Sequence, residues 1–599
     1  MADGANGKLK AKRYSPMILD SYDKERHIKY DDALTLVRAE SHLSLERLTT
    51  AVDAGDVHAY DFKGTRYLDR LDMGRAFHDL PDKKEGLTIK RFFSDGKTDP
   101  YESAGSYQRK ELELRNKEGG IVFKMDDAEF PQSWDSNNAT VVSKLYFYKP
   151  NSPDQKEKLR QKIGNDHEYS LRHLVARVTN FFADEGWKLG YFKTEEDRNT
   201  FRDELAYLQM NRMFAFNTPV QINAGLYNEY GVEGSSKRVY WRNPATGQVD
   251  LIDREFVRPQ THACFIKGPR DNLDSILEHF HDEGAIFSNG SGIGQNIGVL
   301  RGAGEPLSGG GSSSGALSFL REFDRNAGSI KSGGKSRRAA RMTEMRQSHP
   351  DIMGFIRGKP DEDHKALTLI QNGWSEGMDG DAYGTVAYQN TNLSIQLDDH
   401  FFDQLKINGK IQQRRVVDGK VVGEVEADRM LKEIAFGSWR IGDPAVQYEG
   451  EIQRMHTSKN SGRINSTNPC SEYAFLDDTS CNLASLNLLA FSDLKGNFDI
   501  QRFTKASRLI AIAQDIANDA AGYPIDDIAT ISPEFRTIGL GYANLGALLM
   551  RRGVAYDSLE GRAFAGAVTA LMTGTAYEAS AEMAEGLELL FTMNLIKGI

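Results

Sequence analysis

Alternation of hydrophobic and polar residues predicts strands and helices in turn along this 599-residue chain. Residues 390–397 alternate as a strand does, and residues 263–266 form a short apolar strand. Helical patterns cover residues 168–186, 195–213 and 427–442. Because strands alternate with helices, we expect an α/β fold with a parallel sheet.

The N-terminal part of the chain has a different pattern. Within residues 92–216, residues 113–127 are predicted to form two short strands around a turn. Residues 1–91 are polar and charged, with helical stretches such as residues 31–40, but they contain no motif. We expect an accessory extension of unknown role there, helical or partly disordered, without a nucleotide-binding regulatory site.

The charge and hydropathy of the chain exclude several classes of protein. A formal net charge of -10 provides no basic field of the kind that nucleic-acid binding requires. A nucleotide ligand is not excluded, since a phosphate site needs only a few amides and one or two cations. No run of eighteen apolar residues occurs, and residues 1–10 lack the apolar core of a signal peptide. We therefore expect a cytoplasmic protein that binds neither membranes nor nucleic acid.

Candidate chemistry is concentrated in residues 468–472, Asn-Pro-Cys-Ser-Glu. On an extended or loop backbone, Asn468, Cys470 and Glu472 project to one side, which would form a small reaction centre. Pro469 argues against a helix, because it removes a backbone donor and restricts the residue before it. A turn in which Cys470 is only a small buried hydrophobic residue is the alternative.

The chain has three cysteines, Cys264, Cys470 and Cys481. None forms a Cys-x-x-Cys pair, and no histidine has zinc-ligand spacing to two of them, so we predict no metal site. Three widely spaced cysteines do not form a disulfide scaffold. In a reducing cytosol, any disulfide between them would be transient and catalytic.

Two longer segments resemble a known family. Residues 468–472, followed by Phe-Leu-Asp-Asp-Thr-Ser-Cys-Asn-Leu-Ala-Ser-Leu-Asn-Leu at residues 475–488, resemble the finger-loop strand of ribonucleotide reductase. Thr-His-Ala-Cys-Phe-Ile at residues 261–266 resembles the first barrel strand of that family. The separation of eleven between Cys470 and Cys481 is closest to the adenosylcobalamin-dependent class II enzymes. The similarity runs from about residue 92 to about residue 586.

The resemblance implies a fold. Residues 217–588 would form part of a ten-stranded α/β barrel with a finger loop, following the helical domain of residues 92–216. Family members continue through the second half of the barrel, whereas residues 589–599 of this chain depart from the family. We expect a frameshift there, and a split gene with a separate C-terminal polypeptide is the alternative.

The chemistry of ribonucleotide reduction gives the motif residues their expected roles. A thiyl radical on Cys470 would abstract the 3′ hydrogen reversibly, because its bond to hydrogen matches the ribose C–H bond in strength. Glu472 would be the general base for the 3′-hydroxyl, and the amide of Asn468 would hold the 2′ and 3′ oxygens. The resemblance implies that Cys264 and Cys481 are the redox-active pair that supplies two electrons.

The resemblance also implies binding sites. Thr218, Ala263 and Gly294 correspond to substrate-binding positions, although the segment around Thr218 could equally be an ordinary loop entering a strand. The glycine- and serine-rich residues 302–315 and the basic residues 331–341 resemble loops 1 and 2, which bind a deoxynucleotide effector. Lys335, Arg337 and Arg338 would meet its phosphates. A solvated, flexible basic loop is the alternative.

Adenosylcobalamin is the cofactor that the class II resemblance implies, and a tyrosyl-radical partner subunit is the competing source of the radical. The other implied partners are a ribonucleotide substrate, a thioredoxin-like reductant and a second copy of the chain in a homodimer. The expected enzyme is a vitamin B12-dependent ribonucleoside-diphosphate reductase. Two rival functions remain at this point: a glycyl-radical acyltransferase on the same type of barrel, and an inactive nucleotide-binding fragment.

Overall fold

The computed structural model describes residues 86–587, except residues 117–118, 236, 245, 331–338 and 378–379, and four short strands nearer the N-terminus. Residues 86–582 form one compact unit, and residues 1–85 with 583–599 form another. In the unit that contains residues 1–85, the strands pair in the order β1-β3-β4-β2 and form a small sheet that the sequence pattern did not predict. The helical stretch expected at residues 31–40 lies outside the described residues. The four strands are β1 (Met17–Ile18), β2 (His27–Lys29), β3 (Ala59–Phe62) and β4 (Thr65–Asp69).

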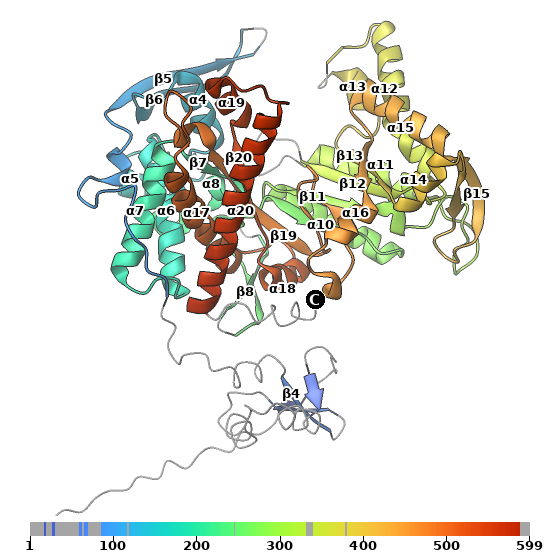
Figure 1. The fold of residues 1–599 in the computed structure, drawn as a ribbon, viewed down its shortest axis with the longest axis horizontal. Coiled ribbons are helices and arrows are strands. Elements are labelled where there is room, and N and C mark those ends of the chain that lie inside the picture. Colours follow the sequence, from blue (N-terminus) through green and yellow to red (C-terminus); the bar gives the residue numbers. More distant parts are fainter. Residues whose placement is uncertain are drawn as a thin grey trace, which may run out of the picture. The chain divides into compact units, whose positions relative to one another are not determined.

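The larger unit begins with a helical region that carries a two-stranded ribbon (Figure 1). The strands expected around a turn within residues 113–127 are the antiparallel pair β5 and β6. The helices expected near 168–186 and 195–213 are α6 and α7, so these predictions are confirmed. The elements of this region are β5 (Tyr107–Arg115), β6 (Ile121–Pro131), α4 (Ser136–Leu145), α5 (Pro153–Ile163), α6 (Leu171–Lys188) and α7 (Glu195–Met210).

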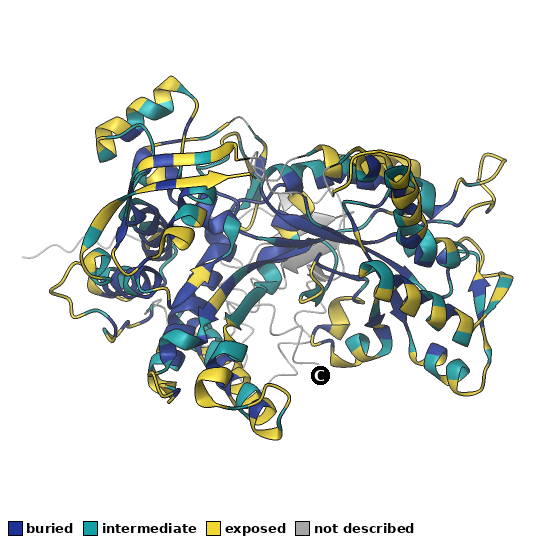
Figure 2. Cartoon of the chain, turned by 90° about the horizontal axis from the view of Figure 1, so that it is seen from above, coloured by how far each residue is buried: buried dark blue, intermediate teal, exposed yellow. Residues whose placement is uncertain are grey.

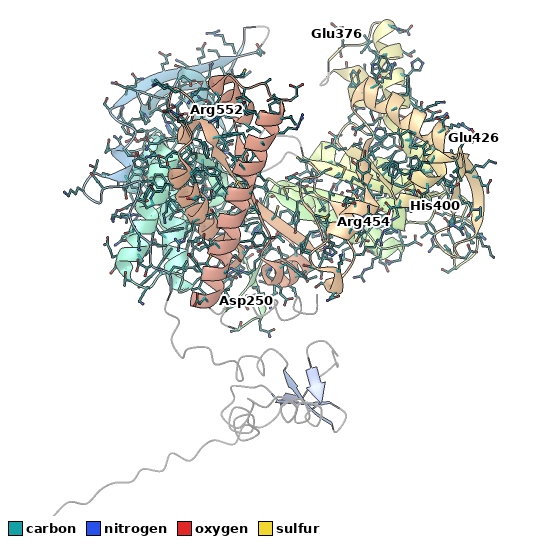
Figure 3. The ribbon with its side chains drawn as sticks, in the orientation of Figure 1. Asp250, Glu376, His400, Glu426, Arg454 and Arg552 are labelled. Atoms are coloured by element: carbon teal, nitrogen blue, oxygen red, sulfur yellow. The ribbon has the colours of Figure 1, made fainter. Side chains whose placement is uncertain are left out.

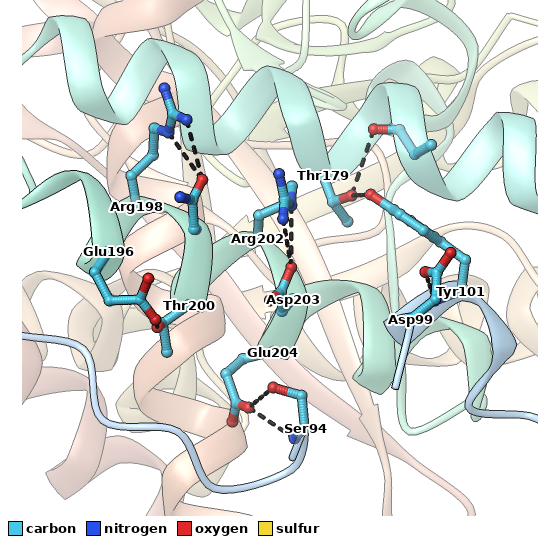
Figure 4. Close-up of polar contacts among 12 residues, drawn as sticks. Ser94, Asp99, Tyr101, Thr179, Glu196, Arg198, Thr200, Arg202, Asp203 and Glu204 are labelled. Carbon is cyan, nitrogen blue, oxygen red and sulfur yellow. Dashed lines mark hydrogen bonds and ion pairs between the residues drawn. The ribbon is translucent and has the colours of Figure 1, made fainter. Parts of the chain in front are cut away.

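Helix α7 begins at a capping box, in which Thr194 and Asp197 bond each other's backbone amides. The preceding chain docks on this helix through buried carboxylates. Glu204 accepts hydrogen bonds from the backbone amides of Phe93 (2.8 Å) and Ser94 (2.8 Å), and the contact with Ser94 is drawn in Figure 4. The hydroxyl of Tyr101 lies 3.2 Å from that of Thr179 on α6.

The main sheet has the strand order β16-β13-β12-β11-β10-β19-β20, with β7 also paired to β19. Strands β10 to β13 and β16 are parallel to one another, as are β19 and β20. The two parallel sets meet where β10 and β19 pair in antiparallel fashion. The strands are β7 (Phe214–Phe216), β10 (Cys264–Ile266), β11 (Gly292–Asn296), β12 (Arg341–Arg346), β13 (Asn392–Leu397), β16 (Ala445–Tyr448), β19 (Thr479–Asn487) and β20 (Ile538–Ala543).

Helices pack against this sheet and bury its central strands (Figure 2). One apolar cluster joins α10, α11, α12 and α15 to strands β12 and β13. Helix α17 is buried along most of its length and contacts both β19 and α6. These helices are α10 (Leu273–Ser288), α11 (Ala316–Ser329), α12 (Ile352–Gln371), α15 (Ala427–Ile441), α17 (Ile500–Ala520), α18 (Asp526–Phe535), α19 (Leu545–Arg552) and α20 (Leu559–Leu587). The helix expected at residues 427–442 is α15, and the strand expected at residues 390–397 is β13.

Short elements complete the unit. They are α8 (Thr218–Asn223), α9 (Leu226–Tyr230), β8 (Val239–Arg242), β9 (Val249–Ile252), α13 (Asp381–Thr385), α14 (Asp399–Lys406), β14 (Lys410–Arg414), β15 (Val421–Glu426), α16 (Glu449–Met455), β17 (Ser466–Thr467) and β18 (Ala474–Phe475). Polar side chains such as Asp250, Glu376 and His400 are exposed on the outside of the unit (Figure 3). Among the described helices, none combines the length and the apolar character needed to cross a bilayer.

Candidate active site

The pairing of β10 with β19 brings two of the three cysteines together. Cys264 is the direct partner of Cys481 in this antiparallel pair. Opposite residues of such a pair have Cα atoms about 4.5–5.5 Å apart, a separation that disulfide geometry accepts. Both side chains are buried, and both are in the thiol form. The strand register therefore brings the two sulfur atoms close to each other.

The finger loop, here residues 465–478, begins at β17, turns, and returns as β18. Its tip is closed by two bonds between Asn468 and Tyr473. The amide of Asn468 donates to the carbonyl of Tyr473 (2.9 Å), and the amide of Tyr473 donates to Oδ1 of Asn468 (3.0 Å). Ser471 has a φ of 66°, in the left-handed region. Of the extended and loop backbones on which the motif was expected, the structure therefore has the loop, which turns at this point.

The turn nevertheless directs two motif side chains to one thiol. Nδ2 of Asn468 donates to the sulfur of Cys264 (3.0 Å), and the Cys264 thiol donates to Oε1 of Glu472 (3.5 Å). Cys470, between them in the sequence, is exposed at the tip of the loop. Asn468 is fully buried, and its amide group both donates to Cys264 and accepts from Tyr473.

Burial and mutual contact set the ionisation of the buried groups. The hydrogen bond to Cys264, together with burial, holds the pKa of Cys481 well above its ordinary value. Cys481 is therefore a neutral thiol at physiological pH. Burial also raises the pKa of Tyr473, whose hydroxyl bonds Thr479 (2.7 Å) and lies 3.0 Å from that of Thr537. Sequence reasoning missed Tyr473, although an aromatic residue directly after the motif was visible.

The three expected substrate-binding residues differ in their surroundings. Thr218 is the half-buried first residue of α8, whose Val220 amide is already bonded to the Asn217 side chain (3.1 Å). The backbone amide of Ala263 donates to the carbonyl of Cys481 (3.2 Å), and its carbonyl accepts from the amide of Gly292 (3.0 Å). Both of its backbone groups are therefore bonded to neighbouring strands.

Gly294 is explained by packing. A Cβ atom built on Gly294 would lie 1.5 Å from the carbonyl oxygen of Thr467, so only glycine lets the finger loop lie directly on β11. The structure therefore gives this residue a role in close backbone approach.

The expected effector loops are only partly described. Lys335, Arg337 and Arg338 lie in residues 331–338, outside the described residues. Residues 302–315 form an irregular loop. In this loop the Gly304 amide donates to the carbonyl of Ser313 (2.9 Å), and the Ser313 amide donates to the carbonyl of Glu305 (2.8 Å).

A cavity of about 770 Å³ lies beside the C-terminal end of β10, but none of the predicted site residues lines it. Most of the charged residues around it are acidic, and its Lys267 is paired with Asp478 (2.9 Å) and Asp527 (2.8 Å). We therefore centre the candidate site on the three cysteines.

Comparison with known proteins agrees with this geometry. The family model described as "Ribonucleotide reductase, barrel domain" matches residues 262–593, more than half of the chain. The chain belongs to the ribonucleotide reductase family. A second reductase model, "Class II vitamin B12-dependent ribonucleotide reductase", matches residues 108–212. The expected fold class, an α/β barrel with a helical region before it, is thereby confirmed.

Individual reductases are similar over most of this chain. The "Vitamin B12-dependent ribonucleotide reductase" of Rhodopirellula baltica is 41% identical over 506 residues, which are 84% of this chain and 47% of the relative. That of Streptomyces avermitilis is 39% identical over 508 residues, 84% of this chain and 48% of the relative. The "Vitamin B12-dependent ribonucleoside-diphosphate reductase" of Thermoplasma acidophilum is 27% identical over 450 residues, 75% of this chain and 50% of the relative. The chain thus spans about half the length of these relatives.

Proposed function

We propose that this chain carries the thiyl-radical centre of a ribonucleotide reductase, which converts ribonucleotides to 2′-deoxyribonucleotides. One observation carries the proposal: Cys264 lies opposite Cys481, and its sulfur also contacts Asn468 and Glu472, the residues that flank Cys470. In this proposal, the dithiol, the carboxylate of Glu472, the amide of Asn468 and the thiol of Cys470 act as one site.

These groups account for the chemistry of the reaction. A radical on the Cys470 sulfur abstracts the 3′ hydrogen, and Glu472 takes the proton of the 3′-hydroxyl. The 2′-hydroxyl then leaves as water after it receives a proton. Cys264 and Cys481 supply two electrons and two protons as their dithiol becomes a disulfide, and Cys470 returns the 3′ hydrogen. In sum, a C–OH bond becomes C–H, and one water and one disulfide are formed.

The exposure of Cys470 fits a large external cofactor, because only this thiol of the three is exposed at the loop tip. Adenosylcobalamin, when bound, supplies the initiating radical by homolysis of its cobalt–carbon bond. The names of the relatives, which include vitamin B12 dependence, support this cofactor. Cys470 is the residue of this chain that would receive the radical.

The remaining partners follow from the reaction. Each turnover leaves a buried disulfide, so a thioredoxin-like dithiol in a reducing cytosol is needed to restore it. The name of the Thermoplasma acidophilum relative supports a ribonucleoside diphosphate as substrate. We also propose a deoxynucleotide effector that binds Lys335, Arg337 and Arg338, and a homodimer.

A single-turnover assay tests the proposal. The pre-reduced chain is mixed anaerobically with ribonucleoside diphosphate and adenosylcobalamin, alone and with the C-terminal half of a relative, without external reductant. We expect at most one deoxyribonucleotide per chain, with Cys264 and Cys481 oxidised. Cys470→Ser should give none, and Glu472→Gln should slow the reaction by about 10²–10⁴-fold, the usual range for general-base catalysis.

Controls separate the outcomes of this assay. Cys481→Ser should still bind nucleotide but form no product. Product formed by Cys470→Ser would disprove the role of this thiol. If neither the chain alone nor the mixture forms product while nucleotide still binds, the inactive nucleotide-binding fragment is the correct interpretation.

A further inference from the structure

A buried carboxylate on β12 holds the finger loop from across the sheet. Glu344 is fully buried, and its carboxylate accepts four hydrogen bonds. The backbone amide and the hydroxyl of Thr467 both donate to Oε1 at 2.8 Å. The amide of Gln447 donates to the same oxygen (2.8 Å), and that of Gln396 donates to the other. Thr467 is the third residue before Cys470, so these contacts fix the chain just ahead of the proposed radical site.

Neighbouring strands extend this anchor. Asn296 on β11 and Gln396 on β13 both donate to the carbonyl of Asn465, at 2.9 and 2.8 Å. Asn296 is the register partner of Glu344, and Gln396 is the partner of Gln447. Strands β11, β12, β13 and β16 therefore each place one polar side chain against residues 465–467.

The segment between this anchor and Cys470 is stiff. Pro469 has a fixed φ, and its carbonyl accepts a hydrogen bond from the Asn392 side chain (3.0 Å). The hydroxyl of Thr467 receives a further bond from Gln447 (2.9 Å). Displacement of Thr467 would therefore move Asn468, which covers the Cys264 sulfur.

Stability alone does not explain a carboxylate at this position. A buried carboxylate costs free energy to desolvate, and the groups that donate to Glu344 are neutral amides and a hydroxyl. An apolar side chain of similar size would avoid that cost, whereas a carboxylate can accept all four of these donors at once.

We propose that Glu344 is a positioning residue that fixes the finger loop on the sheet and thereby presents Cys470 next to Cys264 and Cys481. The proposal rests on the proposed function for its purpose, but not for its geometry. A test that needs no turnover therefore separates the two.

The test uses the thiol that the loop covers. Cys264 is buried under Asn468 and Glu472, so it should react with iodoacetamide only when the loop moves. We expect Glu344→Ala in the full chain to raise the rate of Cys264 alkylation about tenfold or more, because all four hydrogen bonds are lost. Glu344→Gln keeps an acceptor and should give a smaller rise. Peptide mass spectrometry of the alkylated chain measures the rate at each cysteine.

The matched control is Glu305→Gln. Glu305 is also buried and accepts the backbone amides of Gly302, Val416 and Val417, but it does not touch the finger loop. In Glu305→Gln, the rate of Cys264 alkylation should stay within about twofold of the wild-type rate. An unchanged Cys264 rate in a folded Glu344→Ala chain would overturn the proposal. So would an equal rise in Glu305→Gln, or amide exchange that accelerates throughout the chain rather than in residues 465–473.

The pH dependence of the Cys264 alkylation rate tells whether the charged carboxylate of Glu344, or only the volume of its side chain, holds the finger loop. Burial raises the pKa of Glu344 to about 7. The groups that contact it from β13, β16 and β17 are uncharged, as is its register partner on β11. Below pH 7 the wild type carries a neutral group, as Glu344→Gln does, so the ratio of their Cys264 rates should approach one. Above pH 7 the Cys264 alkylation rate of Glu344→Gln, divided by that of the wild type, should rise.

The other ionisable groups of the chain are the same in both proteins, so their effects on the alkylation rate cancel in this ratio. A ratio that does not change with pH would overturn the assignment of the carboxylate as the anchor. This readout is independent of reductase activity, so failure of the proposed function and failure of this inference are distinguishable.

Discussion

At the scale of the residue, the finger loop packs closely on β11 because Gly294 has no side chain. Gly294 lets the carbonyl of Thr467 approach β11 to a distance that no Cβ atom would allow. The neighbouring Gly292 faces Pro469 in the same way, because a Cβ there would lie 2.7 Å from the proline ring. The loop that carries Cys470 is therefore seated on two glycines.

The change Gly294→Ala should displace the loop or strain the strand. We expect the free energy of unfolding to fall by about 1–3 kcal/mol, the usual cost of overpacking. Gly541→Ala is the control, since a Cβ there meets only Ser485 at an ordinary 3.8 Å. Urea denaturation of both variants measures the difference. Equal stability of Gly294→Ala and Gly541→Ala would contradict the close approach.

Single residues were predictable where chemistry demands a residue type. The sequence singled out Asn468, Cys470 and Glu472, because an amide, a thiol and a carboxylate occupy alternate positions within five residues. It did not reveal Glu344, because Thr467 lies 123 residues away and only the strand order brings them together. Contacts of this kind depend on the register of the sheet, which local pattern does not encode.

At the scale of the element, a buried arginine joins the helical region to the segment that precedes strand β10 of the main sheet. Arg177 on α6 bonds Glu168 at 2.7 Å, and neither side chain is exposed. Its guanidinium also donates to the carbonyls of Gln221 and Ala224, both at 2.7 Å. Helix α6 thereby holds α8, the helix that begins at Thr218.

Arg177→Met should leave the Glu168 carboxylate buried without its cation and the two carbonyls without donors. We expect the free energy of unfolding to fall by about 3–5 kcal/mol. The control is Arg160→Met, which removes an exposed contact to Asp166 (3.4 Å) and should cost about 0–1 kcal/mol. Similar urea midpoints for the two variants would show that the buried pair does not hold α8.

Elements with strong periodicity were predicted well, and short ones were not. Helices α6, α7 and α15 follow from apolar positions repeated over many residues. Strands β17 and β18 have two residues each, too few for any alternation to appear. Strand β17 contacts β11 and β12, and β18 pairs with β17, so both depend on contacts that are distant in the sequence or formed only in the fold.

At the scale of the whole molecule, the antiparallel junction between two sets of parallel strands places the cysteines. In the described part of the chain, β16 and β20 are the edges of this sheet, and the β10–β19 junction lies within it. The sequence predicted alternating strands and helices in a parallel sheet, but it did not predict the reversal of direction at β19, because periodicity carries no information about strand direction. That reversal is what sets Cys264 opposite Cys481.

Mild oxidation of the reduced chain tests this arrangement most directly. The folded protein, at low concentration, is treated with a stoichiometric thiol oxidant, and its cysteines are mapped by mass spectrometry. The account predicts a disulfide between Cys264 and Cys481, with Cys470 still a thiol. A dominant disulfide that includes Cys470, or a chain in which Cys264 and Cys481 both stay reduced, would contradict it.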